Sequence, residues 1–537
     1  MNPFAFLRRK RLVRLFAALT ALLALASCGG GGASSGGGEK VVNMAFTTAW
    51  GSFNPYYSAS TTMYELGLYD KIFDKLVFTD MGGAEILPRA ADSWENADGG
   101  YSAVFHLSEK ASWSDGEKAT AHDWVFTANL LADPNSAFST RVFTHELAGT
   151  DESGVRVDGE TFGAEALDDY TLKFAFKKPM DVEDFLLHYN RKFLVLPEHI
   201  LGGADPAKIL EADFWRKPIG SGPCVYVSQM TGSEMTLAPN QFYQFRDPEN
   251  SGNWDKLILR VTDSASRVTP LLSGEIDFIE LGNSINPDDK PVAESGGMTV
   301  RAGDIRNFFM EVLLNESGIP DPKIRRALHY AIDKEAVTEA AASVVGTPCY
   351  SYEMLNTDYY DPSLEFPRDV EKAKALLKEA GYDGRAYNFA FAAKRENIAV
   401  LLAQQWQEAG INVNMSIVDV ATMFSGLSSG VYDIGLSGHS ASAYSLWFES
   451  EFPANLTDAA YSKDPVRADY AERIAAAIDK EEKIALVKEY QRYLSEQTWF
   501  IPLYFAGEYW VEPTRVSGIR NSASLMCNDN VWEWRVE

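Results

Sequence analysis

The sequence predicts an α/β protein built from two or more domains, and two observations support this prediction. The chain has 537 residues, which is more than a single hydrophobic core usually organises. In its second half, stretches with helical periodicity alternate with short strand-like stretches, and this alternation is typical of a partly parallel sheet covered by helices on both faces. A hydrophobic fraction of 46% and a charged fraction of 23% are ordinary for a globular protein.

The chain begins like a secretory signal. Five basic residues lie between positions 8 and 14. They are followed, with a short overlap, by an apolar run from Leu12 to Ala26, which is too short to span a bilayer well. It ends in Leu25-Ala26-Ser27-Cys28, which resembles the lipobox of bacterial lipoproteins and implies cleavage before Cys28 and lipid attachment to its thiol. Residues 29–38 are nearly all Gly and Ser, a composition typical of a flexible tether. The alternative is an ordinary signal peptide with an incidental Cys28.

The first half of the mature chain is expected to contain extended segments and one well-marked helix. Extended segments are expected at 41–46, 101–107 and 170–176, where apolar residues cluster or alternate. Thr120 and Asp123 have the spacing of a capping box, and an apolar stripe at helical spacing follows them.

The second half contains helices with recognisable ends. Asp321-Pro322 combines a capping residue with Pro in the first turn. Asp369 is expected to cap a helix that ends at Gly381, and residues 411–417 alternate as a strand. Two polar-faced helices and an apolar strand are expected toward the C-terminus, at 465–478, 480–497 and 499–505.

Net charge and the spacing of Cys and His exclude several classes of protein. The formal net charge is −26, and removal of residues 1–27, which carry five positive charges and no acidic residue, changes it to −31; we therefore expect no nucleic-acid partner. Besides Cys28, Cys224, Cys349 and Cys527 allow one disulfide, and the sequence does not choose the pair. Because there is no Cys-x-x-Cys and no His-x-x-x-His, we expect no metal site and no cofactor.

Two short motifs resemble catalytic or phosphate-binding loops, but each lacks a required residue. The glycines from Gly220 onward have Val225 where Gly-x-Gly-x-x-Gly needs its last Gly, and no helix-forming run follows. Gly438-His439-Ser440-Ala441-Ser442 lacks the final Gly of the nucleophile elbow Gly-x-Ser-x-Gly. We therefore expect a protein that is not an enzyme.

Several short segments, spread over about 400 residues, together point to one protein family. Each segment alone is weak evidence, but their occurrence in a fixed order is specific. The segments are Phe105-His106-Leu107, Trp113-Ser114-Asp115-Gly116, Ala121-His122-Asp123, Gly220-Ser221-Gly222-Pro223 with Tyr226, Ile324-Arg325-Arg326-Ala327-Leu328-His329-Tyr330-Ala331-Ile332-Asp333, Lys374-Ala375-Leu376-Leu377-Lys378-Glu379-Ala380-Gly381-Tyr382, Ala409-Gly410-Ile411-Asn412-Val413, Tyr432-Asp433-Ile434 and Ile501-Pro502-Leu503. In this order the segments resemble the peptide-type solute-binding proteins of ABC importers, extracellular family 5.

The resemblance implies a two-lobed clamshell, the type II periplasmic-binding-protein fold, with an extra small subdomain in lobe one. After the signal peptide (1–27) and the lipidated Cys with its tether (28–40), the resemblance implies lobe one (41–265 plus 505–537), an extra subdomain (86–164) within it and lobe two (266–504). In this family solute binds between the lobes, and closure presents a fixed surface to the permease. Such a receptor needs a cleft and a hinge but no catalytic group.

The resemblance also implies ligand-binding residues on the first turn of lobe one and on one loop of lobe two. These residues are Phe53, Tyr57, His439, Ser442, Tyr444 and Trp447. In the family an Asp that pairs with the α-amine of the ligand follows Gly-Trp-x-x; here His439 stands in place of Trp and Ser442 in place of Asp. A buried ammonium without a partner is costly, so either another carboxylate serves or the ligand has no free amine. For the aromatic residues, packing within a lobe is the alternative role.

The sequence thus predicts a lipid-anchored, monomeric substrate-binding receptor of an ABC importer, working outside the cytoplasmic membrane and delivering peptides to a permease. A non-peptide ligand, such as an oligosaccharide or a metal chelate, is the alternative within this class. The alternatives outside the class are a secreted lipoprotein hydrolase and a sensory or adhesive receptor that transports nothing.

Overall fold

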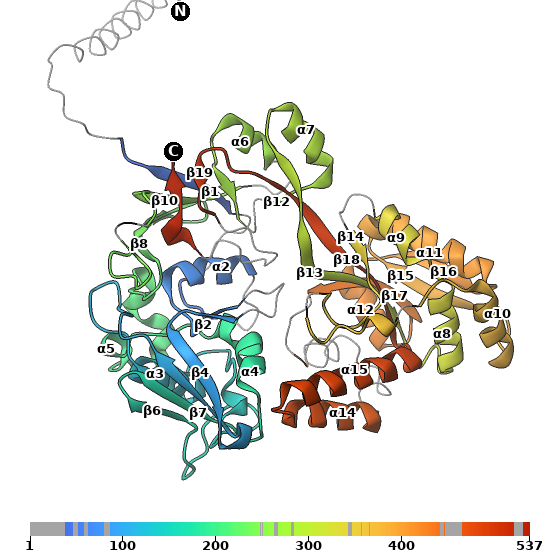
Figure 1. Cartoon of the computed structure of the whole chain (residues 1–537), viewed down its shortest axis with the longest axis horizontal. Helices are drawn as coiled ribbons and strands as arrows, with labels where there is room; N and C mark the ends of the chain where they lie inside the picture. The colour runs from blue at the N-terminus through green and yellow to red at the C-terminus, as the bar shows by residue number, and fades with distance from the viewer. Residues whose placement is uncertain are drawn as a thin grey trace, which may run out of the picture. The chain divides into compact units, whose positions relative to one another are not determined.

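The computed structural model describes a chain that folds into two sheet-based lobes. The described residues are 38–46, 52–57, 63–79, 86–247, 249, 251–262, 267–280, 284–341, 346–355, 357–364, 366–440, 445, 464–519 and 530–537. Residues Lys40–Glu537 form one compact unit, and all the elements labelled in Figure 1 belong to it.

Lobe one is built around a five-stranded sheet with the order β11-β1-β10-β9-β8 (Figure 1). β1 (Val41–Phe46) runs parallel to β10 (Lys256–Val261) and to β11 (Phe278–Ile279). β9 (Glu234–Pro239) and β8 (Cys224–Met230) follow in antiparallel order. The strand expected at 41–46 is confirmed.

A four-stranded antiparallel sheet with the order β4-β5-β7-β6 completes lobe one. Its strands are β4 (Ala91–Ala97), β5 (Ser102–Leu107), β7 (Thr171–Ala175) and β6 (Ala164–Asp168). α3 (Ala121–Ala132) begins at the predicted capping box, in which the Asp123 carboxylate accepts a hydrogen bond from Thr120 N at 2.9 Å. One hydrophobic core contains residues of both sheets and of α3.

The shorter elements around these sheets connect the strands. They are α2 (Met63–Ile72), β2 (Val77–Thr79), β3 (Ile86–Pro88), α4 (Val182–Tyr189), α5 (Glu198–Leu201), α6 (Val268–Ser273), α7 (Lys290–Ser295), β19 (Val516–Ser517) and β20 (Arg535–Val536).

Lobe two is built around a seven-stranded mixed sheet with the order β12-β18-β13-β17-β15-β16, in which β14 also pairs with β18. The strands are β12 (Ser284–Ile285), β13 (Val300–Leu314), β14 (Gly346–Pro348), β15 (Ala386–Phe391), β16 (Asn412–Ile417), β17 (Ile434–Ser440) and β18 (Phe500–Val511). β15 runs parallel to both β16 and β17. The predicted partly parallel sheet is therefore confirmed.

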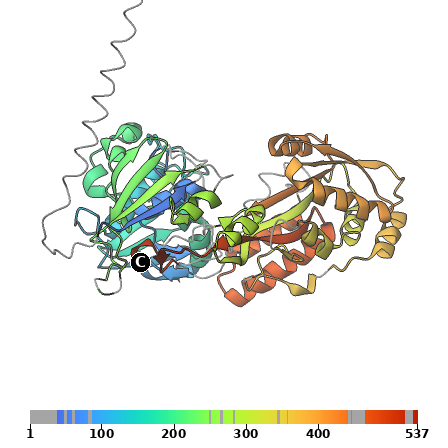
Figure 2. The same ribbon diagram turned by 90° about the horizontal axis from the view of Figure 1, so that it is seen from above.

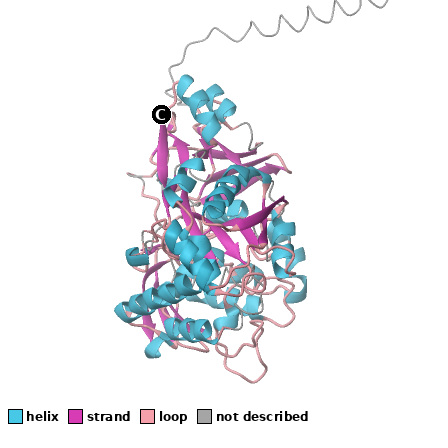
Figure 3. Cartoon of the chain, turned by 90° about the vertical axis from the view of Figure 1, so that its right-hand side faces the viewer, coloured by secondary structure: helices cyan, strands magenta, loops and turns pink. Residues whose placement is uncertain are grey.

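Helices cover both faces of this sheet, as Figure 3 shows from the side on which lobe two faces the viewer. They are α8 (Pro322–Tyr330), α9 (Lys334–Ala340), α10 (Val370–Glu379), α11 (Glu396–Glu408), α12 (Val420–Ser428), α14 (Pro465–Ala476) and α15 (Lys480–Gln497). Phe389 and Phe391 of β15 belong to one hydrophobic cluster, whereas Ala390 belongs to another. Because successive strand residues point to opposite faces, the two clusters lie on opposite sides of the sheet.

The predicted helix ends of lobe two are confirmed where local signals mark them. Asp321 accepts a hydrogen bond from Lys323 N at 2.8 Å, and Asp369 accepts one from Lys372 N at 2.8 Å. Gly381 follows α10 with a φ of 67°, a left-handed conformation that glycine adopts without strain. The C-terminal strand begins as expected but continues to Val511.

Two long strands, β13 and β18, run from the lobe-one side of the unit into the sheet of lobe two (Figures 1 and 2). They pair antiparallel from Val300 opposite Val511 to Leu313 opposite Phe500, with register shifts between Ala302 and Phe308 and at Met310. β11 lies beside β1, although the expected boundary at 265/266 assigns it to lobe two. The domain boundaries themselves stay predictions.

Candidate functional site

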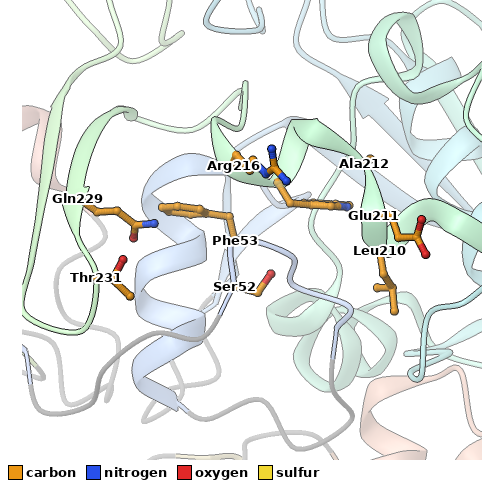
Figure 4. A pocket seen from close by; sticks show the side chains of 9 residues that line it. Ser52, Phe53, Leu210, Glu211, Ala212, Arg216, Gln229 and Thr231 are labelled. Atoms are coloured by element: carbon orange, nitrogen blue, oxygen red, sulfur yellow. The ribbon is translucent and has the colours of Figure 1, made fainter.

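A pocket of about 450 Å³ opens in lobe one between three separate segments (Figure 4). The first segment follows β1, the second is a pair of 3-10 turns, and the third is the end of β8. The lining residues are Ser52, Phe53, Leu210, Glu211, Ala212, Trp215, Arg216, Gln229 and Thr231. Its volume is in the range of sites for small solutes.

Two aromatic rings in the pocket are held in fixed positions. Phe53 is 2% exposed and makes an edge-to-face contact with Tyr226, with 4.8 Å between ring centroids. The indole nitrogen of Trp215 donates a hydrogen bond to the Ile209 carbonyl at 2.6 Å, and the side chain is 7% exposed. Rings held in this way offer apolar contact to a solute without losing further side-chain entropy.

The turn that carries Phe53 is fixed by its own sequence. The Asn54 side chain accepts a hydrogen bond from Tyr56 N at 2.9 Å, and its carbonyl accepts one from Tyr57 N at 3.2 Å, an arrangement that Asn favours in turns. The Tyr56 hydroxyl donates to the Leu194 carbonyl and accepts from Leu194 N. The turn is therefore anchored to the core of lobe one.

The polar part of the lining is exposed to solvent. Glu211, Gln229 and Thr231 are exposed, and the guanidinium of Arg216 lies 3.1 Å from the Asp213 carboxylate in an exposed ion pair. These groups offer an anion, a cation, an amide and a hydroxyl to a solute.

The structure describes three of the six predicted ligand-binding residues, at least in part. Phe53 lines the pocket, whereas Tyr57 lies on the same turn with 58% of its surface exposed and is not part of the lining. His439 lies in β17, where it pairs with Phe309 of β13. Ser442, Tyr444 and Trp447 lie outside the described residues, as does Cys28, so their roles stay predictions.

Glu280 was not predicted, yet it lies where parallel strands end. It follows β11, whose carboxyl end lies beside that of β1, and such edges commonly carry ligand sites in α/β sheets. It is 1% exposed, and neither carboxylate oxygen has a hydrogen-bond partner among the described residues. A Cβ at Gly67 would lie 3.0 Å from Oε1, so the missing side chain leaves room for the carboxylate. Burial raises the pKa of Glu280 well above its usual value, although Lys71 and Arg267 oppose this.

Cys224 and Cys349 are buried free thiols. Burial raises the pKa of each to about 12, which makes both unreactive as nucleophiles. Cys527 lies outside the described residues. Within the described part of the chain, no group of three or more His, Cys, Asp or Glu side chains is arranged to hold a metal ion.

No helix among the described residues has both the length and the apolar character needed to cross a membrane.

The fold and the pocket together define a two-lobed α/β binding protein, and comparison with known proteins identifies the family. Residues 85–451 match the model of the bacterial extracellular solute-binding proteins, family 5 Middle. The chain therefore belongs to this family, whose members are substrate-binding proteins, and its fold is that of the type II periplasmic binding proteins.

Relatives support this assignment over most of the chain. The periplasmic oligopeptide-binding protein OppA of Salmonella typhimurium is 23% identical over 81% of this chain and 81% of its own. The heme-binding protein A of Haemophilus influenzae is 25% identical over 87% of both chains. The crystal structure of the ABC transporter substrate-binding protein CtaP from Listeria monocytogenes has a TM-score of 0.78 and 22% identity, covering 93% of this chain and 99% of that one.

Proposed function

We propose that this protein is the substrate-binding receptor of an ABC importer and that it captures peptides between its two lobes. The lobe-one pocket is the observation that carries this proposal, because two fixed aromatic rings stand beside an anion, a cation, an amide and a hydroxyl. A peptide presents apolar side chains, charged termini and amide groups, and each finds a matching group in this lining. One relative, OppA of Salmonella typhimurium, is an oligopeptide-binding protein by name, which agrees with this choice.

A metal chelate is the second candidate, because another relative is named a heme-binding protein. A large apolar macrocycle is best served by a mainly apolar slot. The exposed Glu211, Arg216 and Gln229 make this pocket more polar than such a slot. The lining therefore favours peptides.

Because Ser442 stands where the family has its Asp, the amine of a bound peptide needs a carboxylate from another position. Glu211 lines the pocket, and Glu280 lies at the carboxyl edge of the same lobe. Either carboxylate would offset the charge of a ligand ammonium, which is costly to bury without a partner.

We further propose that the protein works as a monomer without catalysis, anchored outside the cytoplasmic membrane through a lipid on Cys28. The lipobox-like sequence and the Gly/Ser tether support the anchor, and membership of a family of substrate-binding proteins supports binding over turnover. Cys28→Ser should release the protein from membranes. Membrane fractionation of cells that make this variant tests the anchor, and continued membrane association would contradict it.

Native mass spectrometry of the purified protein tests the peptide assignment. We expect co-purified peptides that leave on denaturation and are recovered uncleaved, and a rise in the unfolding temperature when they are added back, because a ligand of the native state stabilises it. Hemin added in the same assay is the control. Stabilisation by hemin alone would move the assignment to a chelate, and cleaved peptides would favour the hydrolase.

A further inference from the structure

A buried ion cluster joins α4 of lobe one to α15 of lobe two. Nζ of Lys483 lies 2.8 Å from Oδ2 of Asp181 and 2.5 Å from Oδ2 of Asp184. The Lys483 side chain is 0% exposed, and the two carboxylate side chains are 14% and 15% exposed. Lys483 thus meets both carboxylates where two parts of the molecule, far apart in sequence, touch.

Further donors complete the cluster. Oδ1 of Asp181, the residue that caps α4, accepts from the Asn96 side chain at 3.1 Å and from Glu183 N at 3.3 Å. Asp184 accepts from Ser445 N at 2.9 Å and from Ser445 Oγ at 2.7 Å. A buried ion group is favourable when hydrogen bonds satisfy its remaining acceptors, and these carboxylates meet that condition.

Apolar contacts flank the cluster. Leu187, one turn beyond Asp184 on α4, packs against the hydrophobic cluster of lobe two that contains Tyr490 and Leu494 of α15. At Gly100 an added Cβ would lie 2.5 Å from Cδ1 of Ile478, just before α15. By contrast, Phe185 on another face of α4 lies in the core of lobe one. One face of α4 therefore packs within its own lobe, and another face meets lobe two.

Asp184 also reaches the segment in which the family resemblance places ligand recognition. Ser445 follows β17 by a few residues, between the predicted ligand-binding residues Tyr444 and Trp447. A single carboxylate of lobe one thus holds both α15 and this segment of lobe two.

We propose that Asp181, Asp184 and Lys483 form a latch between the lobes, with Asp184 also bound to Ser445 of lobe two; this rests on the proposed function. Among the described elements, the chain passes between the lobes near β11–β13 and after β18, so the latch contacts are non-covalent and break when the lobes separate. A ligand bound between lobes favours the closed arrangement through its differential affinity. A latch that favours the same arrangement raises the apparent affinity by raising the population that is competent to bind.

Three variants test the latch with a matched control. Lys483→Met leaves two carboxylates facing each other, Asp184→Asn removes one charge at constant size, and the triple variant Asp181→Asn/Asp184→Asn/Lys483→Met removes all charge. Arg473→Met is the control, because Arg473 lies on α14 beside α15 and its exposed partners, Asp469 at 3.2 Å and Glu489 at 4.0 Å, both belong to lobe two. If Lys483→Met does not fold, Asp184→Asn and the triple variant carry the test.

Two measurements are made on the full-length protein. The first is the distance distribution between spin labels at exposed positions in the two lobes, Leu167→Cys and Val466→Cys. The second is the retention of peptides from a tryptic digest of serum albumin, titrated and quantified by mass spectrometry. We expect longer or broader distances and an apparent affinity about ten-fold weaker for Lys483→Met and Asp184→Asn, partial recovery in the triple variant, and no change for Arg473→Met.

The latch and the proposed function fail in different ways. Distances and peptide retention that stay at the wild-type values in both Lys483→Met and Asp184→Asn would overturn the latch. A wild-type protein that retains no peptide, while the latch variants still lengthen the distances, would overturn the peptide receptor and support the latch. Equal loss of retention in Arg473→Met and Lys483→Met would assign the effect to α14 and α15 alone and overturn the latch.

Discussion

Lobe one and the contact between the lobes each contain a buried ion cluster, and their consequences differ. Within lobe one, Arg89 donates to the Asp74 carboxylate, and Nζ of Lys75 lies 2.8 Å from Asp70, all four within or close to α2 and β3. Lys483 instead binds carboxylates of the other lobe. The first cluster is lost only when lobe one unfolds, whereas the second is lost when the lobes separate. The same chemistry therefore contributes to folding stability in one place and to conformational balance in the other.

Arg89→Met should give the largest effect on stability. Arg89 is 1% exposed, donates to Asp74 and to the Asp70 carbonyl, and lies 4.8 Å from the centroid of the Phe78 ring. Removing one partner of a buried ion pair costs about 3–5 kcal/mol of unfolding free energy. Urea denaturation measures this loss, with the exposed Lys323→Met, which breaks a 3.1 Å pair with Glu379, as the control. Equal losses in the two variants would remove the distinction between a buried and an exposed pair.

Glu280→Gln should stabilise the protein at neutral pH. Burial raises the folded-state pKa of Glu280 well above 4.5, so the native state binds a proton before the unfolded state does as the pH falls. The ionised carboxylate therefore lowers stability above its folded pKa, and this penalty fades as the pH falls toward 4.5. We expect a gain in unfolding free energy at pH 7, because Gln is neutral and carries no penalty for ionisation, and a smaller gain at pH 5. A gain independent of pH in urea titrations would contradict this explanation.

His329→Leu should reduce the loss of stability in acid. His329 is 1% exposed and stacks on Phe366 with 4.3 Å between ring centroids. Burial lowers the pKa of His329 well below 6.5, and the positive charges of Lys334 and Arg326 lower it further. The unfolded chain therefore takes up the proton first, so stability present above pH 6.5 is lost as the pH falls toward the folded pKa. Thermal unfolding between pH 7 and pH 5 should show a shallower decline than in the wild type. The exposed His122→Gln is the control, and the same decline in all three proteins would exclude His329 as the cause.

Arg216→Met should have the smallest effect on stability. The Arg216 and Asp213 side chains are more than four-fifths exposed, and such pairs contribute less than about 1 kcal/mol. The same variant should weaken retention of peptides with a free carboxyl terminus, because the pocket loses its guanidinium. Unchanged retention with unchanged unfolding free energy would remove Arg216 from the site.

Local signals in the sequence predict many of the helix ends in lobe two. They do not predict contacts between segments that are far apart in the sequence. Asp369 and Gly381 mark the ends of α10 because capping depends on residues within one turn. The pairing of β11 with β1 joins segments more than 200 residues apart, and no local pattern encodes it.

The residues of the candidate site also fall into those that a local motif could predict and those that depend on distant segments. Phe53 could be predicted from its turn, because Asn54 and Pro55 follow it. Trp215 and Glu280 were missed, because each is defined by neighbours from distant segments. An acidic residue directly after the apolar pair Phe278-Ile279 was the available signal for Glu280.

The irregular pairing of β13 with β18 has a mechanical consequence. The ladder changes register between Ala302 and Phe308, on the stretch that leads into lobe two, and is regular again from Glu311 to Leu313. Register shifts weaken a ladder and let a strand bend, so this two-stranded ribbon is compliant in its middle and stiff where it joins the seven-stranded sheet. Amide protons between 303 and 308 should therefore exchange with solvent faster than those of Val312 and Leu313. The compliance needs no proline and no flexible linker, because it is built into the pairing itself.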